Sequence, residues 1–90
     1  MKIILVYDIS TENKYKNQIR KVCTKYLIHI QNSVFEGELE SPLLLKLKKE
    51  LEKYLDSLLD SIIIFEFKYN VPTNKTILGI NKNDFDGYNI

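Results

Sequence analysis

The chain has 90 residues, enough for one small domain, and with 44% hydrophobic and 28% charged residues its composition excludes a disordered chain. The formal net charge of +1 gives no overall argument for nucleic-acid binding, but residues 1–34 carry six basic and two acidic side chains, whereas residues 35–66 carry four basic and eight acidic ones. The single cysteine, Cys23, cannot form an internal disulfide, and no apolar run is long enough to span a membrane, so the sequence predicts a cytoplasmic protein.

The first half of the chain predicts a strand, a helix and an extended segment. Residues 1–8 are apolar on both faces, as in the central strand of a sheet. Ser10 or Thr11 then offers a hydroxyl that could cap the helix. Residues 28–39 alternate as an extended segment, with a bulge or short break at Gln31-Asn32 that would divide it into two strands. The residues at helical spacing that predict the buried stripe of the first helix are Tyr15, Ile19, Val22, Cys23 and Tyr26.

The second half predicts another helix, a strong strand and a weak one. Ser41 followed by Pro42 is typical of a helix start, with a capping hydroxyl before the first helical residue. Residues 61–69 alternate as a strand. Residues 70–74 contain a proline and predict a loop or turn, and residues 77–80 predict a short edge strand. The apolar stripe expected on the second helix is Leu44, Leu47, Leu51, Tyr54, Leu55 and Leu58.

This order of elements predicts an α+β, ferredoxin-like βαββαβ fold, with an antiparallel sheet, both helices on one face and an extra short C-terminal strand. We expect a single domain over residues 1–80 and a polar tail over residues 81–90 that is either loose or ordered by a partner. Six tyrosines, four phenylalanines and long Ile/Leu runs are more apolar surface than one small core hides, so we also expect a homodimer.

Asp8 is the candidate catalytic and metal-binding residue. It ends an apolar strand, where its carboxylate either caps the following helix or serves as a metal ligand or general base. One carboxylate holds Mg²⁺ poorly, but Asp8 and its copy in a two-fold dimer could flank one ion. The other chemically active residues have simpler interpretations, since Cys23 lies on a buried helical stripe and His29 begins a strand.

Two surfaces are candidates for binding nucleic acid. The basic side chains of the first helix would contact phosphates without sequence preference, or they would simply form a solvated helix face. Alternatively, Phe65, Phe67 and Tyr69 share one face of a strand and could stack the bases of single-stranded RNA, although burial in the core or in a dimer is the expected role of such residues. The candidate phosphate contacts are Lys14, Arg20, Lys21 and Lys25.

Two motifs at this spacing resemble a known family. They are Tyr7-Asp8-Ile9 after a strand and Gln31-x-Ser33-Val34-Phe35-Glu36 after a basic helix ending at Tyr26. A later segment, Asp60-Ser61-Ile62-x-Ile64-x-x-Phe67, adds to the likeness. Over most of residues 1–80 the chain resembles the CRISPR-associated adaptation protein family Cas2.

The resemblance implies a ferredoxin-like homodimer that bridges dimers of the CRISPR integrase subunit and binds spacer-precursor DNA during spacer acquisition. It also implies a magnesium-dependent endonuclease activity on RNA or double-stranded DNA, with Asp8 at the metal position. Ser33 and Phe35 would be supporting residues near the same dimer seam. A toxin-like or stand-alone metal-dependent endoribonuclease on the same scaffold is the alternative.

Overall fold

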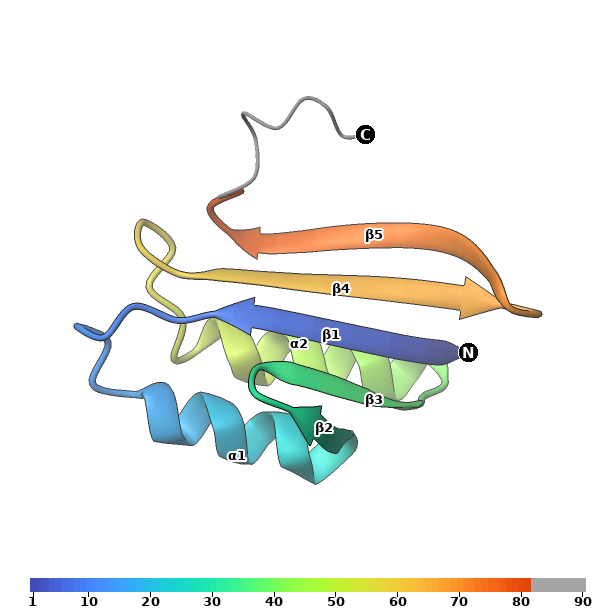
Figure 1. The fold of residues 1–90 in the computed structure, drawn as a ribbon, viewed down its shortest axis with the longest axis horizontal. Coiled ribbons are helices and arrows are strands. Elements are labelled where there is room, and N and C mark those ends of the chain that lie inside the picture. Colours follow the sequence, from blue (N-terminus) through green and yellow to red (C-terminus); the bar gives the residue numbers. More distant parts are fainter. Residues whose placement is uncertain (82–90) are drawn as a thin grey trace.

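Residues 1–81 are the part of the chain that the computed structural model describes, and within them five strands form one sheet in the order β2-β3-β1-β4-β5 (Figure 1). Every neighbouring pair of strands is antiparallel. This arrangement confirms the predicted α+β fold and the order of its elements, while the predicted tail, apart from Asn81, lies outside the described residues. The elements are β1 (Lys2–Asp8), α1 (Lys16–Tyr26), β2 (Ile28–Gln31), β3 (Val34–Glu38), α2 (Ser41–Glu52), β4 (Ser61–Lys68) and β5 (Val71–Gly79).

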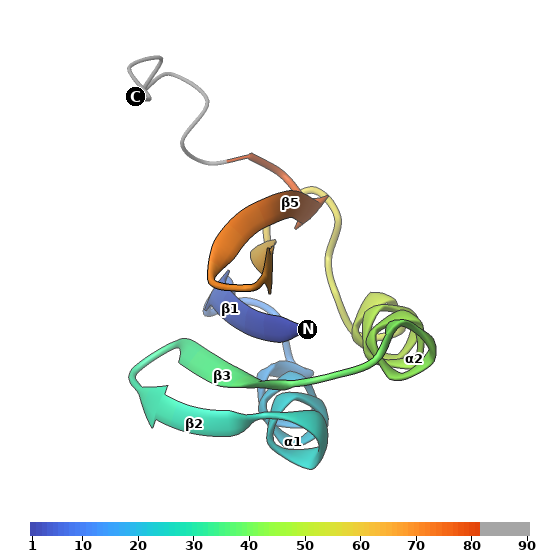
Figure 2. The same ribbon diagram turned by 90° about the vertical axis from the view of Figure 1, so that its right-hand side faces the viewer.

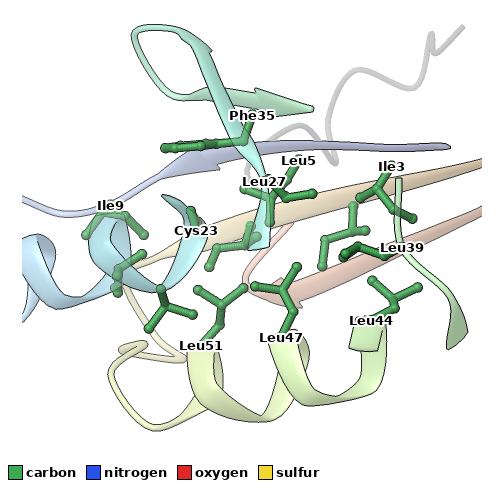
Figure 3. Packing of buried hydrophobic residues seen from close by; sticks show 14 residues of the cluster. Ile3, Leu5, Ile9, Cys23, Leu27, Phe35, Leu39, Leu44, Leu47 and Leu51 are labelled. Atoms are coloured by element: carbon green, nitrogen blue, oxygen red, sulfur yellow. The ribbon is translucent and has the colours of Figure 1, made fainter. Parts of the chain in front are cut away.

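The core lies between the sheet and the two helices, which cover the same face of the sheet (Figure 2). Alternate residues of the central strand, Ile3 and Leu5, are fully buried there, and Leu5 lies opposite Ile64 of β4. From the helix layer, leucines of α2 point toward the sheet (Figure 3). Among residues 1–81, neither helix is long and apolar enough to cross a membrane. The remaining fully buried core side chains are Ile19, Cys23, Phe35, Leu47, Leu51, Ile62 and Ile64.

No helix within the described residues covers the opposite face of the sheet, which we call the open face (Figure 2). Its centre is apolar because β1 and β4 contribute Ile4, Val6, Ile63 and Phe65, paired as Ile4 with Phe65 and Val6 with Ile63. All four are only half-buried. The sequence favoured core or dimer burial for the Phe65 side of β4, but the core of this chain uses the other side of that strand.

Helix α1 begins at Lys16, so the predicted start next to Ser10 or Thr11 was wrong. Residues 10–15 instead form two side-chain-stabilised turns, in which Ser10 Oγ accepts from the Glu12 N–H at 3.1 Å and Asn13 Oδ1 accepts from the Tyr15 N–H at 2.7 Å. Such local hydrogen bonds compete with helix formation. The buried residues of α1, Ile19, Val22 and Cys23, lie on the predicted stripe.

Helix α2 differs from its prediction at both ends. Ser41 is the first helical residue rather than the cap, which is Glu40, and Glu40 makes no side-chain capping hydrogen bond. The helix ends at Glu52, so Leu58 lies beyond it and is 78% exposed instead of continuing the apolar stripe. Leu44, Leu47 and Leu51 of the helix are buried, and Tyr54 and Leu55 just beyond its end still pack against the core, so the predicted stripe fails only at Leu58.

Two tight turns join the hairpins of the sheet. The predicted break at Gln31-Asn32 is a turn in which Asn32 has a φ of 43°, next to an irregularity in the pairing of β2 with β3. The loop or turn predicted over residues 70–74 is a turn made by Tyr69 and Asn70, with φ values of 55° and 63° as two-residue hairpin turns require, and its predicted extent was wrong because the next strand begins at Val71. Strand β5 is accordingly long, and it accommodates Pro72 because the strand lies at the sheet edge opposite a bulge.

Candidate nucleic-acid site

Asp8 ends β1 and is exposed, as the sequence predicted. Its backbone lies opposite Ser61 of β4, and the Tyr7 N–H beside it donates to the Ser33 carbonyl oxygen at 3.1 Å. Alternation along β1 places the Asp8 side chain on the same face as Ile4 and Val6, at one end of the open face. The sheet therefore presents a carboxylate at the end of an apolar surface.

The donor set around Asp8 in one chain is small. Among residues 1–81, no group of three or more His, Cys, Asp or Glu side chains is arranged to hold a metal ion. A carboxylate is the kind of hard oxygen ligand that Mg²⁺ takes, and Mg²⁺ commonly uses one or two carboxylates with waters and substrate phosphates. Asp8 fits that pattern as one ligand, and a second protein carboxylate would come from another copy of the chain.

Phe35 and Ser33 support the end of β1 in different ways. Phe35 is fully buried on the helix side of the sheet, with its ring 5.5 Å from that of Tyr7 and stacked on His29 at 4.8 Å. Ser33 is half-buried and contributes the carbonyl that holds the Tyr7 backbone. Both residues thus contact Tyr7, the neighbour of Asp8, and their predicted place near a dimer seam stays a prediction.

Three of the four predicted phosphate contacts, Lys14, Arg20 and Lys21, are exposed side chains. Arg20 and Lys21 line a hollow of about 220 Å³ together with Asn17 and Thr24, the neighbours expected on one face of a helix. Every side chain lining this hollow is basic or neutral. Burial raises the pKa of the Tyr7 hydroxyl, and the positive charge of Arg20 opposes part of that rise. The basic face of α1 therefore extends toward the end of β1.

Lys25, the fourth predicted contact, is exposed but paired. Its Nζ lies 2.6 Å from Glu50 Oε1 of α2, and Glu50 also accepts a hydrogen bond from the Tyr26 hydroxyl. These hydrogen bonds lower the pKa of the Glu50 carboxyl and raise the pKa values of both Lys25 and Tyr26. Lys25 thus shares its charge with a carboxylate and is the weakest of the four as an anion ligand.

Asp60 is a positioning residue that the sequence reasoning did not single out. It is fully buried before β4 and accepts hydrogen bonds from the Ser10 N–H at 2.7 Å, Asn13 Nδ2 at 2.6 Å and the Asp56 N–H at 2.8 Å. These bonds join the loop that follows Asp8 to the loop that precedes β4. The available signal was an aspartate directly before the most apolar strand of the chain.

Comparisons with known proteins place these features in a family context. A family model described as CRISPR associated protein Cas2 matches residues 1–72. The chain is 44% identical over 80 residues to the CRISPR-associated endoribonuclease Cas2 3 of Thermodesulfovibrio yellowstonii, covering 89% of each chain. It is 42% identical to the CRISPR-associated endoribonuclease Cas2 of Fusobacterium nucleatum, covering 98% of this chain and 86% of the other. The crystal structure of Streptococcus pyogenes Cas2 at pH 6.5 superposes with a TM-score of 0.67 and 28% identity, covering 78% of this chain and 89% of that one.

Proposed function

The chain belongs to the CRISPR-associated Cas2 family, and from this we propose that it is a CRISPR adaptation protein acting in the cytoplasm. In this role it is a homodimer that bridges two dimers of the CRISPR integrase subunit and holds spacer-precursor DNA during spacer acquisition. The observation that carries the proposal is the exposed basic face of α1, where Arg20 and Lys21 line a hollow without an acidic side chain.

The basic face suits a duplex held by its backbone. Arg20 and Lys21 are exposed and carry permanent positive charge at neutral pH, and Asn17 and Thr24 add neutral polar groups beside them. Side chains of this kind bind phosphates of any sequence and release counterions as they do so. Spacer precursors vary in sequence, so a contact that reads only the backbone is the kind this function needs.

The homodimer is supported by the open face. Ile4, Val6, Ile63 and Phe65 make its apolar centre and remain half-buried in one chain. A contiguous apolar surface of this kind marks a protein interface, and two-fold symmetric packing would cover both copies at once. Asp8 lies at the end of the same face, so such a dimer draws the Asp8 carboxylates of both copies toward the interface.

A second activity, that of a metal-dependent endonuclease, is favoured by the exposure of Asp8 at the strand end, and the two relatives described above are named endoribonucleases. The Asp8 carboxylates of two copies would hold the ion, and when bound, Mg²⁺ supplies charge neutralisation at a phosphate and an acidified water. Arg20 and Lys21 would hold the nucleic-acid backbone, and Phe35 and Ser33 would fix Tyr7 and with it the direction of Asp8. Without the integrase, the same site would make a stand-alone endoribonuclease.

Spacer acquisition in cells carrying the cognate integrase tests the adaptation role. We expect the double variant R20A/K21A to acquire far fewer spacers than wild type while still forming a dimer and binding the integrase in size-exclusion chromatography. The matched control is K46A/K49A, which removes two exposed lysines from α2 instead. Normal acquisition by R20A/K21A, or equal loss in the control, would contradict the proposed DNA contact.

The nuclease activity is tested separately with Asp8→Asn, which removes one charge and keeps the side-chain shape. Wild type should cleave single-stranded RNA or double-stranded DNA only when Mg²⁺ is present, and Asp8→Asn should cleave neither while remaining folded and dimeric. Magnesium-dependent cleavage that persists in this variant would refute the role of Asp8. If Asp8→Asn acquires spacers normally, adaptation does not use the carboxylate.

A further inference from the structure

The hairpin formed by β4 and β5 ends in a turn that projects past the rest of the sheet (Figure 1). The last pair between β1 and β4 joins Lys2 to Phe67, so residues 68–71 lie beyond the end of β1. We call residues 68–71 the hairpin tip, and all of them are exposed. Asp8 ends β1 at its other end, toward which the basic face of α1 extends. The hairpin tip is therefore separate from the candidate metal position and from the candidate phosphate contacts.

Tyr69 has a backbone conformation in this turn that bulky residues rarely adopt. Its φ is 55° and that of Asn70 is 63°, so both residues are left-handed. Two-residue turns of this kind favour asparagine, aspartate or glycine, a preference that Asn70 meets and Tyr69 does not. Tyr69 is also 91% exposed, so packing within the chain does not explain why a tyrosine stands here. An unfavourable backbone conformation that carries an exposed aromatic ring points to a contact with another molecule.

A hollow of about 440 Å³ lies beside Tyr69. Its apolar lining comes from the Met1, Phe67 and Tyr69 side chains, and the Met1 amine lies 3.8 Å from Glu38. Val71, which is 56% exposed, adds a second apolar side chain to the hairpin tip. A hollow of this volume has room for a side chain of a binding partner. The tip thus offers both a projecting ring and a recess next to it.

The charges around this hollow are balanced, unlike those that line the hollow on α1. The basic side chains are Lys2 and Lys68, and the acidic ones are Glu38 and Glu40. Lys2 is in addition paired with Glu36 at 3.2 Å. A phosphate backbone would meet carboxylates here, so the hollow does not suit a nucleic acid. An exposed aromatic ring among polar groups of both signs is instead typical of a surface that binds a protein.

The contact would be made by side chains rather than by an added strand. Strand β5 lies at the edge of the sheet, but close to the tip Pro72 has no N–H to offer. Thr73 is an extra residue between the pairs Glu66–Asn74 and Phe67–Pro72, and its hydroxyl donates to the Glu66 carbonyl oxygen at 3.1 Å. A proline and a bulge both hinder pairing with a further strand. Tyr69, Val71 and the hollow are therefore the features that a partner would contact.

We propose that the hairpin tip is the docking site for the CRISPR integrase subunit. The Tyr69 ring enters an apolar pocket of the integrase, and an integrase side chain occupies the hollow beside it. This inference rests on the proposed function, which requires three binding surfaces on each chain. The basic face of α1 is assigned to DNA and the open face to the second copy, and the tip belongs to neither. A dimer carries two tips, one for each integrase dimer that it bridges.

Isothermal titration calorimetry of the full-length protein with the purified cognate integrase tests the docking site. Tyr69→Asn removes the ring but places a residue suited to the turn, so in urea denaturation the variant should be at least as stable as wild type. Its affinity for the integrase should nevertheless fall by about tenfold or more, as on loss of a buried interface tyrosine. Tyr69→Phe keeps the ring and should retain most of the affinity. Leu58→Asn is the matched control, because it removes another exposed hydrophobic side chain and should bind as wild type does.

Wild-type affinity in Tyr69→Asn would overturn the docking site and leave the proposed function intact. A monomeric Tyr69→Asn protein in size-exclusion chromatography would also overturn it, since the tip would then belong to the dimer interface. The same holds if Tyr69→Asn loses affinity for duplex DNA in the absence of the integrase, or if it is less stable than wild type. If the wild-type protein does not bind the integrase, both proposals fail.

Discussion

Asp60 shows how one side chain can fix the surroundings of another. Its carboxylate accepts three hydrogen bonds from groups in two loops, and its removal would take this acceptor from the Ser10 and Asp56 N–H groups, while Asn13 Nδ2 would keep the Tyr54 carbonyl oxygen. Leaving a buried donor unsatisfied costs about 1–3 kcal/mol. Because Ser10 follows Asp8 closely, the same bonds also set where the end of β1 points.

We expect Asp60→Ala to lower the free energy of unfolding by on the order of 3 kcal/mol, as the loss of a buried hydrogen-bond network does. Urea denaturation measures it, with Glu52→Ala as the control because Glu52 is exposed at the end of α2. The control should change the unfolding free energy by less than about 0.5 kcal/mol. Equal midpoints for the two variants would show that Asp60 has no such role.

For single residues, the sequence predicted the position correctly where that position depends on neighbours close by in the chain. Asp8 at the strand end and Cys23 in the helical stripe both lie where periodicity placed them, and burial raises the pKa of the Cys23 thiol to about 12, as suits a core residue. Asp60 could not be interpreted in this way, because two of its hydrogen-bond donors, on Ser10 and Asn13, are 50 and 47 positions away. No local pattern contains those partners.

Between elements, the clearest polar contact is a pair of hydrogen bonds that join the two helices, from Lys25 and Tyr26 of α1 to Glu50 of α2. Lys46 lies one turn before Glu50 on α2, at the spacing of a helical ion pair, but the structure pairs Glu50 with Lys25 of α1. Similarly, the start of α1 was mispredicted because Asn13 is held by the Tyr54 carbonyl, just after α2, and by Asp60 rather than by its own helix. Helix periodicity therefore identified the buried face of each helix. Where a helix begins or ends depended instead on hydrogen bonds to residues outside that helix.

The hydrogen bonds that Glu50 accepts from α1 predict that the stability of the fold depends on pH. Hydrogen bonds from Lys25 and Tyr26 lower the pKa of Glu50 below its ordinary 4.5, so the stabilisation is present above pH 4.5 and is lost as the pH falls through the lowered value. The thermal midpoint of wild type should therefore fall more steeply below pH 4.5 than that of Glu50→Gln. Glu52→Gln, at an exposed site on the same helix, should follow wild type. Parallel curves for wild type and Glu50→Gln would contradict this.

The end of β5 is fixed against the start of β4, and a glycine makes this approach possible. Gly79 has a φ of +82°, and a Cβ there would lie 2.1 Å from the Asp60 carbonyl oxygen, a backbone atom that also accepts from the Ile80 N–H. We expect Gly79→Ala to lower the free energy of unfolding by about 1–3 kcal/mol in denaturant titrations. Gly37→Ala is the matched control, because its Cβ would meet only the flexible end of the Leu27 side chain, at 2.8 Å. A larger loss in the control would be inconsistent with this explanation.

For the molecule as a whole, the sequence predicted the fold class and the need for a partner surface. It did not predict which face of β4 is buried, because both faces of that strand are apolar and only packing against α1 and α2 distinguishes them. The strand that it predicted for β5 was also too short, because Pro72 indicates a loop unless the strand is known to lie at the edge of the sheet. These errors concern the assembled sheet rather than any one segment.

We expect Phe65→Glu to convert the dimer to a monomer in analytical ultracentrifugation, because it places a charge in the apolar centre of the open face. Leu58→Glu, at a 78% exposed position, should leave the dimer unchanged. Circular dichroism establishes that both variants are folded. The thermal midpoint of wild type should also rise with protein concentration, whereas that of Phe65→Glu should not. A dimeric Phe65→Glu would place the interface elsewhere.

The central position of β1 has a consequence for how the chain is made on the ribosome. Strand β1 pairs with β4, whose residues come more than fifty positions later, and the loop that follows β1 is held by Asp60. Contacts between such distant segments form slowly, because a long stretch of chain must first be closed into a loop. During synthesis β1 therefore lacks one of its two neighbouring strands until β4 has emerged, although β3 is already available to pair with it.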